Sequence, residues 1–158
     1  MLMDIRSRIV EVLEKGYLIS LATLDDGGLW VADVIYTFDN DLNIYWMSYP
    51  TTRHSKAIEG NNQAAGSITV TSYWEKPELG IQFSGRAEKI DTLPHDLVVK
   101  YFTKLGDPAP EEGEDVLEGH SWYMLRPNKI DLNDTENFGW NKRSLDILLP
   151  LRQKMRIL

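Results

Sequence analysis

Residues 17–38 read YLISLATLDDGGLWVADVIYTF, which is two runs of branched and aromatic residues separated by a short polar turn. The runs at 17–24 and 29–38 have the composition that is typical of β-strands. The turn between them, DDGG at 25–28, supplies two glycines, which readily adopt the positive φ angles of tight hairpin turns. The stretch therefore predicts a β-hairpin.

The segments on either side of the hairpin predict a helix and a third strand. Residues 3–14 carry apolar side chains at helical spacing, which predicts an amphipathic helix that ends near Gly16. After the polar turn at 39–41, residues 42–48 (LNIYWMS) alternate in the manner of a strand. The hairpin and this strand together predict a three-stranded meander.

The remaining elements predict a small antiparallel barrel with helices around it. Strands dominate, helices interrupt them at intervals, and no internal repeat or domain boundary is present. In chain order we expect strands at 64–74 and 79–90, a helix from Thr92 to Gly106, an acidic loop at 107–119, and a last strand pair within 121–134 that is split by Pro127.

Two local features have more than one interpretation. Gly85 interrupts the strand at 79–90, which predicts a bulge, a close approach of another backbone or a ligand, or a bend at a barrel corner. In the tail, residues 137–151, Phe138 and Trp140 stand among polar residues. Because exposed aromatic residues of this size normally cover something, they predict a docked tail.

The composition excludes several classes of protein. The absence of cysteine rules out disulfides, thiolate metal sites and cysteine nucleophiles, and it suits a reducing cytosol. The first residues lack the apolar region of a signal peptide, and no segment approaches ~20 consecutive apolar residues, so we expect a cytoplasmic protein without a membrane span. A formal net charge of -7 disfavours nonspecific binding to nucleic acid.

Residues 51–62, TTRHSKAIEGNN, predict a short helix capped by one of its two leading threonines. Its first turn carries Arg53, His54 and Lys56, although the helix dipole favours negative charge there. Because this costs only about a few tenths of a kcal/mol, one interpretation is that the cations are simply solvated. The other interpretation is that the helix start and the cations converge on a bound anion, such as a phosphate.

Familiar catalytic motifs are absent from the sequence. It contains neither a GxxxxGK[ST] loop nor a GxGxxG loop, and Ser84-Gly85 lacks the flanking residues of a nucleophile elbow. The three histidines, His54, His95 and His120, do not have the spacing of metal ligands, so we expect no metal site. If the protein is an enzyme, we therefore expect a bound cofactor to supply the difficult chemistry.

Four motifs, taken in their order along the chain, resemble a known family. They are LWVADVIYTFD at 29–39, TTRHSKA at 51–57, IQFSGRAEKI at 81–90 and NDTENFGWNKR at 133–143. Over roughly residues 15–132, the chain resembles the FMN-binding split β-barrel family that is typified by pyridoxamine 5'-phosphate oxidase. Within that family it is most similar to a small, uncharacterised bacterial branch.

This resemblance implies a mainly β (α+β) fold, a six-stranded antiparallel Greek-key split β-barrel with peripheral helices. It also implies that the whole chain of 158 residues forms one FMN-binding domain. The chain is shorter than the oxidase and lacks the C-terminal arginine and histidine segment that holds the oxidase's vitamin substrate. The resemblance is therefore to the superfamily rather than to that enzyme.

The resemblance also implies which residues hold the FMN phosphate. A Ser-Arg-Lys sequence does so in the family, and Thr52, Arg53 and His54 occupy those positions here, with a further hydroxyl from Ser48. Each charge-assisted hydrogen bond would contribute roughly 1.5–3 kcal/mol, which exceeds the dipole penalty. His54 replaces a lysine, and its charge depends on its surroundings, so we expect Lys56 to compensate.

The flavin ring of the family lies along the third strand and against the second, and the sites lie at the interface of a homodimer. Asp33 departs from the family, because a carboxylate beside a reduced flavin opposes its negative charge; flavin binding therefore requires that Asp33 points outward. For Trp122, Phe138 and Trp140, a purely structural role is an equal alternative. The positions implied are Tyr45, Trp46, Met47 and Ser48 on the third strand, Ala32, Asp33 and Val34 on the second, Gln82 and Gly85 on a later strand, and Trp122, Phe138 and Trp140 as aromatic residues that close the pocket.

Three functional hypotheses follow. The first is an FMN-dependent oxidoreductase that acts on a small substrate, with catalytic residues and electron donor unidentified. The second is a dimer of the same fold that binds or senses a flavin, a haem or another phosphorylated ligand without turnover. The third is a structural dimer without a ligand. The sequence does not distinguish FMN from a deazaflavin.

Overall fold

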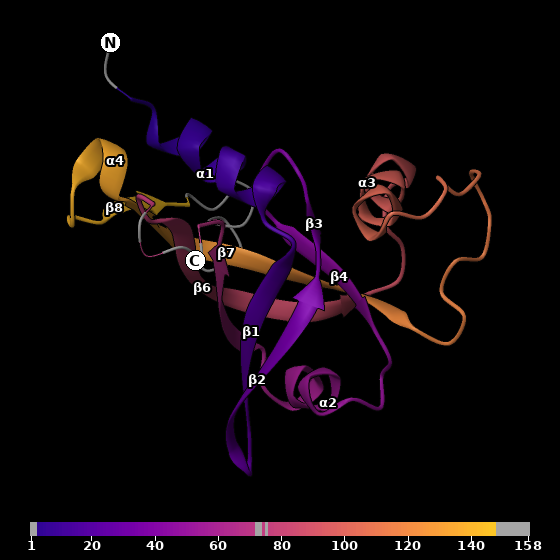
Figure 1. Ribbon diagram of the computed structural model, residues 1–158. Helices are drawn as coiled ribbons and strands as arrows, with labels where there is room; N and C mark the ends of the chain where they lie inside the picture. The colour runs from indigo at the N-terminus through magenta and orange to yellow at the C-terminus, as the bar shows by residue number, and fades with distance from the viewer. Residues whose placement is uncertain (1–2, 72–73, 75, 148–158) are drawn as a thin grey trace, which may run out of the picture.

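The computed structural model describes residues 3–71, 74 and 76–147, in which four helices and eight strands are present (Figure 1). The hairpin, the helix at 53–60 and the helix after Pro94 all lie where the sequence predicts them. In chain order the elements are α1 (Ile5–Lys15), β1 (Leu18–Asp25), β2 (Gly28–Ile35), β3 (Thr37–Phe38), β4 (Ile44–Ser48), α2 (Arg53–Gly60), β5 (Gln63–Thr69), β6 (Leu79–Ile90), α3 (His95–Leu105), β7 (Ser121–Asp134), α4 (Thr135–Phe138) and β8 (Arg143–Asp146).

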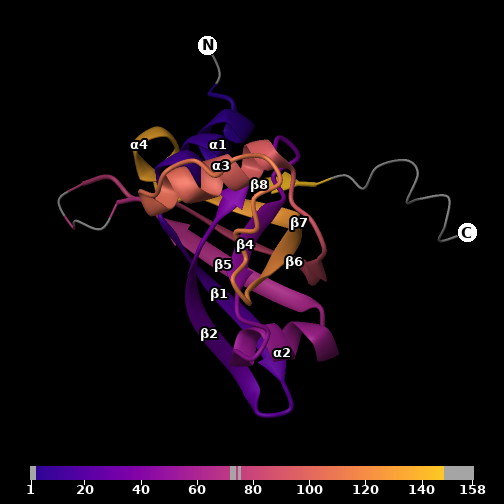
Figure 2. The same cartoon turned by 90° about the vertical axis from the view of Figure 1, so that its right-hand side faces the viewer.

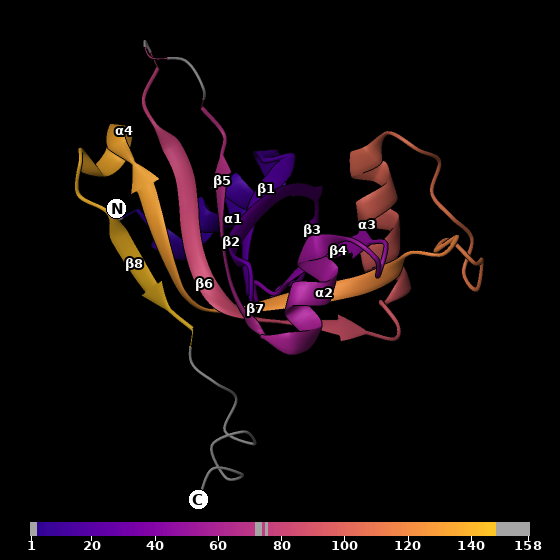
Figure 3. The ribbon, with the colours of Figure 1, turned by 90° about the horizontal axis from the view of Figure 1, so that it is seen from below.

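The strands form one curled antiparallel sheet. Its order is β2-β1-β5-β6-β7-β4-β3, and β8 pairs with β7. The hairpin pairs along its full length, from Leu18 opposite Ile35 to Asp25 opposite Gly28. Figure 3 shows the sheet curling around an interior, and β2 contacts β4 across the open side. This arrangement confirms the predicted antiparallel split barrel with peripheral helices.

The barrel interior holds the main apolar core, and α1 covers one end of it. Ile9, Val12 and Leu13 of α1 are completely buried against the barrel. In Figure 1, α1 lies at the end of the barrel opposite α2. The α1 face that the sequence predicts as apolar is therefore the face that closes the barrel.

The root of the hairpin is tied to two helices. The hydroxyl of Tyr36 donates a hydrogen bond of 2.7 Å to the carbonyl oxygen of Leu13. From α3, the ammonium group of Lys104 donates to the carbonyl oxygens of Leu13 and Gly16, at 3.3 and 2.9 Å. Because Gly16 lies two residues before β1, these bonds fix the point at which the chain enters the hairpin.

The strand count differs from the prediction of six. Residues 29–38 were predicted as one strand, but the chain passes at Tyr36 from β2 to the short β3, which pairs with β4 instead of β1. Residues 121–134 form one continuous strand of 14 residues rather than a split pair. Pro127 does not end this strand because it lies at an irregularity in the pairing with β6, where no ladder donor is needed.

The irregularity is a β-bulge, one of the interpretations predicted for Gly85. The pairing shifts between Ser84 and Gly85, so that Ser84 lies opposite Lys129 while Gly85 lies opposite Pro127. A Cβ atom on Gly85 would stand 2.0 Å from the carbonyl oxygen of Arg126. Close approach of the neighbouring backbone therefore explains the glycine.

The tail after β7 is docked only in part. Phe138 packs against the main core, and β8 pairs with β7. Trp140 is 80% exposed, so for this residue the prediction of a docked side chain is wrong in the isolated chain; it lies in the turn between α4 and β8, beyond the reach of the core. The end of the predicted tail, 148–151, and residues 72–73 of the predicted strand at 64–74 lie outside the described residues.

Candidate functional site

The start of α2 lies beside the far end of the hairpin (Figure 2). Thr52 is its N-cap, and the threonine hydroxyl oxygen accepts a long hydrogen bond of 3.4 Å from the backbone N–H of Ser55. Within the described residues, the backbone N–H groups of Arg53 and His54 have no hydrogen-bond partner. These two groups are free donors at the positive end of the helix.

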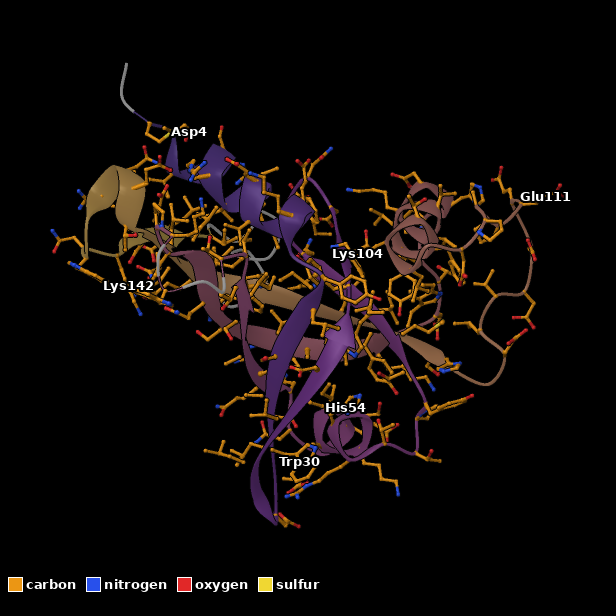
Figure 4. The ribbon with its side chains drawn as sticks, viewed as in Figure 1. Asp4, Trp30, His54, Lys104, Glu111 and Lys142 are labelled. Atoms are coloured by element: carbon orange, nitrogen blue, oxygen red, sulfur yellow. The ribbon has the colours of Figure 1, made fainter. Side chains whose placement is uncertain are left out.

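His54 points into the protein rather than toward solvent (Figure 4). Its Nε2 atom lies 2.9 Å from the hydroxyl oxygen of Ser48 and 3.2 Å from that of Thr52. Burial lowers the pKa of His54, so its imidazole is neutral at neutral pH. A neutral ring that bonds two hydroxyl groups orients those groups and does not act as the cation that the family's lysine supplies.

Arg53 is held by the hairpin. Its Nε and Nη2 atoms donate to the two carboxylate oxygens of Asp25, at 2.9 and 3.1 Å. Its guanidinium carbon lies 4.5 Å from the centre of the Trp30 ring, and a Cβ atom on Gly27 would stand 3.0 Å from Nη2. Hydrogen bonding to Arg53 lowers the pKa of Asp25, so the carboxylate stays ionised. The predicted phosphate-binding arginine is therefore already paired with an internal anion.

The rim of this site carries two aromatic side chains that were not among the predicted site residues. Trp30 from β2 and Tyr49 from the loop before α2 are 44% and 50% exposed. Lys56, the cation expected to compensate for His54, is also exposed and lies in the first turn of α2. The motif DGGLW at the hairpin was a signal for Trp30, but nothing in the sequence marked Asp25 as the partner of Arg53.

The strand predicted to carry the flavin ring is covered on both faces. Trp46 is completely buried in the barrel and stacks on Tyr123 with ring centres 5.8 Å apart. On the other face, Tyr45 packs with Leu97 of α3, and Met47 joins a second cluster beside the same helix. A planar ligand on this part of β4 would have to displace side chains that are already packed.

The second strand offers more open surface. Val34 is buried and Ala32 is half-buried, while Asp33 is exposed and accepts a hydrogen bond of 2.7 Å from the hydroxyl of Ser20. Asp33 thus points outward, which is the arrangement that flavin binding requires. The exposed ring of Trp30 lies between this strand and α2, as Figure 4 shows.

Within the described residues, Gln82 and Trp122 make no side-chain hydrogen bond or ion pair with α2. Gln82 is exposed on β6 and accepts a hydrogen bond from Lys142 at 2.6 Å. Trp122 is buried against Tyr101 of α3, with ring centres 5.1 Å apart. For these residues, as for Trp140, a role in a ligand site remains a prediction.

The described residues contain no group of three or more histidine, cysteine or acidic side chains with the geometry to hold a metal ion. In the same part of the chain, no helix combines the length and apolar character needed to cross a bilayer.

Comparison with other sequences finds relatives that are named UPF0306 proteins. A UPF0306 protein of Pasteurella multocida is 30% identical over 84 residues, which is 52% of this chain and 56% of the relative. The UPF0306 protein YhbP of Escherichia coli is 23% identical over 144 residues, which is 90% of this chain and 93% of the relative. No family model matches the sequence.

Comparison with solved structures supports the fold. A putative pyridoxamine 5'-phosphate oxidase from Listeria innocua matches with a TM-score of 0.63 at 14% identity, over 82% of this chain and 98% of the other. The haem storage protein HutZ from Vibrio cholerae matches with a TM-score of 0.61 at 16% identity, over 79% of this chain and 91% of the other. An F420 reductase matches with a TM-score of 0.58 at 18% identity, over 76% of this chain and 93% of the other. The chain therefore has the split-barrel fold that these proteins share.

Proposed function

We propose that this chain is a cytoplasmic homodimer of the pyridoxamine 5'-phosphate oxidase-like superfamily that binds FMN at the start of α2. The observation that carries the proposal is the set of donors there: two free backbone N–H groups, the Arg53 guanidinium and the Lys56 ammonium. In a chain with a net charge of -7, this set is suited to a phosphate group. The exposed ring of Trp30 is suited to a planar aromatic ligand.

Each residue at the site has a separate task in this proposal. Arg53 and Lys56 supply positive charge to the phosphate, and Arg53 must exchange Asp25 for it at least in part. Ser48 and Thr52 supply hydroxyl groups, which neutral His54 orients through its Nε2 atom. Asp33 stays bonded to Ser20 on the outer face of the hairpin.

The dimer is proposed on the exposed apolar surface of the hairpin. Leu18, Leu29 and Val31 are 41, 78 and 60% exposed, and they lie on two paired strands. A second copy of the chain would remove this surface from water, which is favourable by about 25 cal/mol per Å² of apolar area. Sedimentation velocity that finds only monomer at micromolar concentration would contradict this part of the proposal.

We propose further that the protein is an FMN-dependent oxidoreductase that acts on a small substrate. A bound flavin supplies the hydride-transfer chemistry that protein side chains lack. The chain itself holds the phosphate, positions the ring beside the hairpin and limits access of water. The F420 reductase among proteins of the same fold is consistent with redox chemistry on such a barrel.

The first test is an FMN titration of the purified protein, read from the fluorescence of its five tryptophans. We expect saturable quenching that the substitution Arg53→Glu abolishes, because this change places a negative charge beside the phosphate. Lys89→Glu is the matched control, since Lys89 is also an exposed cation but lies on β6, outside α2. Equal FMN affinity in the two variants would refute the site.

A second candidate function is ligand binding without turnover, of a flavin, a haem or another phosphorylated ligand. It is favoured by His54, because this base at the site is buried and hydrogen-bonded, and is not free to carry protons to a substrate. The haem storage protein of the same fold gives this candidate a precedent. Oxidation of reduced nicotinamide faster than with free FMN would exclude it.

A further inference from the structure

A hollow lies beyond the other end of α2, where β6 and β7 pair. Its volume is about 450 Å³, and residues from three segments line it. None of them belongs to the start of α2. The lining includes Asn62, which follows α2, Arg86 and Glu88 of β6, and Arg126, Pro127 and Asn128 of β7.

The β-bulge places two arginines opposite each other at this hollow. Ser84 pairs with Lys129, and regular pairing from there would set Arg86 against Pro127. Because the bulge adds Asn128 to β7 without a partner on β6, Arg86 instead lies opposite Arg126. The same shift turns Leu125 of β7 into the core beside Ala87, which explains the bulge but leaves the arginine pair unexplained.

The two arginines are only partly neutralised by their neighbours. Like charges directly opposite each other on paired strands repel. Arg126 donates to the carboxylate of Glu88 at 3.2 Å, while Arg86 has only a long hydrogen bond of 3.4 Å to the amide oxygen of Asn62. Within the described lining, two guanidinium groups therefore face one carboxylate, and the local charge is positive in an acidic chain.

We propose that this hollow binds the oxyanion group of a small molecule, a carboxylate or a phosphate, between Arg86 and Arg126. A guanidinium group presents a planar pair of donors that matches both kinds of oxyanion, and the volume is sufficient for a small metabolite. The amides of Asn62 and Asn128 lie at the rim, where they can bond the rest of the ligand. The site shares no residue with the proposed FMN site and does not depend on it.

The test is calorimetric titration of the full chain with inorganic phosphate and, separately, with succinate, at constant ionic strength. We expect one of the two anions to bind in a saturable manner, which identifies the group that the site prefers. Arg86→Gln and Arg126→Gln should each weaken that binding about tenfold, since each removes charge-assisted hydrogen bonds. Lys89→Gln is the control, because Lys89 is an exposed cation on the same strand outside the lining.

A thermal measurement separates binding from a purely structural effect. In buffer without either anion, Arg86→Gln should melt at or above the temperature of the parent, because it removes a like-charge contact. In buffer that contains the anion that binds, the parent should have a higher melting temperature than the variant. The same calorimetric titration of Arg53→Glu should still show anion binding. If this variant alone lost the binding, the anion would be bound at the start of α2 instead.

Absence of saturable binding by both anions would overturn the proposal. So would an affinity that is equal in the parent and in Arg86→Gln. Neither result would affect the FMN assignment, which the titration with Arg53→Glu decides separately.

Discussion

Two arginine–aspartate ion pairs in this molecule share the same chemistry but have different surroundings. Arg8 of α1 bonds Asp134 at 2.7 Å, and their side chains are 15 and 1% exposed. Arg53 of α2 bonds Asp25 at 2.9 Å, and their side chains are 38 and 28% exposed. The first pair joins the first helix to the end of β7, while the second joins α2 to the hairpin.

Burial decides what each pair can do. Burial alone would raise the pKa of Asp134, but hydrogen bonds from Arg8 and Asn137 outweigh it and hold the pKa below its usual value. Removing Arg8 would leave the Asp134 carboxylate inside the protein without its cation. Arg53 and Asp25 are partly hydrated, so water or another anion can replace either partner at small cost. The buried pair is structural, and the exposed pair is exchangeable.

The largest effect is expected for Arg8→Met. It leaves the Asp134 carboxylate buried without its partner, so the free energy of unfolding should fall by about 3–5 kcal/mol. Arg53→Met is the matched variant and should lower it by at most about 1 kcal/mol. Urea unfolding of both variants measures the difference. Equal losses would show that burial is not what distinguishes the pairs.

A smaller effect is expected for Asp25→Asn. This variant removes the internal anion that competes for Arg53, so FMN should bind more tightly, by up to about fivefold, because an exposed pair contributes about 1 kcal/mol at most. The fluorescence titration proposed for FMN measures it, with Asp26→Asn as the neighbouring control. Weaker binding would instead mean that Asp25 holds the guanidinium in the orientation that the phosphate needs.

The smallest effect is expected from the titration of His54. Its pKa is lowered in the folded state, so below about pH 6.5 the unfolded chain takes up a proton that the folded chain does not. The contribution of His54 to the free energy of unfolding should therefore be constant above about pH 6.5. Below that pH it should decrease as the pH falls. In His54→Gln this contribution to the slope between about pH 5 and 6.5 should disappear. An unchanged slope would mean that His54 is accessible and is not held as Ser48 and Thr52 suggest.

The local elements could be predicted from the sequence because their signals are local. The glycines at 27–28 predicted the hairpin turn, and the threonines before Arg53 predicted the start of α2. The family resemblance supplied the split barrel, which no local pattern defines. The division between β2 and β3 was missed, because a strand that changes partners keeps the same composition.

The contacts of the site could be predicted only in part. Asp25 and Arg53 are 28 residues apart, and nothing in either segment marks them as partners. For His54 a signal was present: Ala57 and Ile58 follow it at helical spacing, so all three share the buried face of α2. The imidazole of His54 was nevertheless predicted to be part of the basic surface, because that prediction rested on its residue type and not on its position in the helix.

The contact between Arg53 and Trp30 gives the protein a built-in optical reporter. The indole ring lies 4.5 Å from a guanidinium group whose partner a bound phosphate would change, so occupancy of the site alters the electrostatic field at that ring. Of the other tryptophans, Trp46 and Trp122 are buried away from α2, while Trp74 and Trp140 are open to water. A chain in which Trp30 alone is replaced by phenylalanine would therefore lose the part of the spectral response that arises from the change at Arg53.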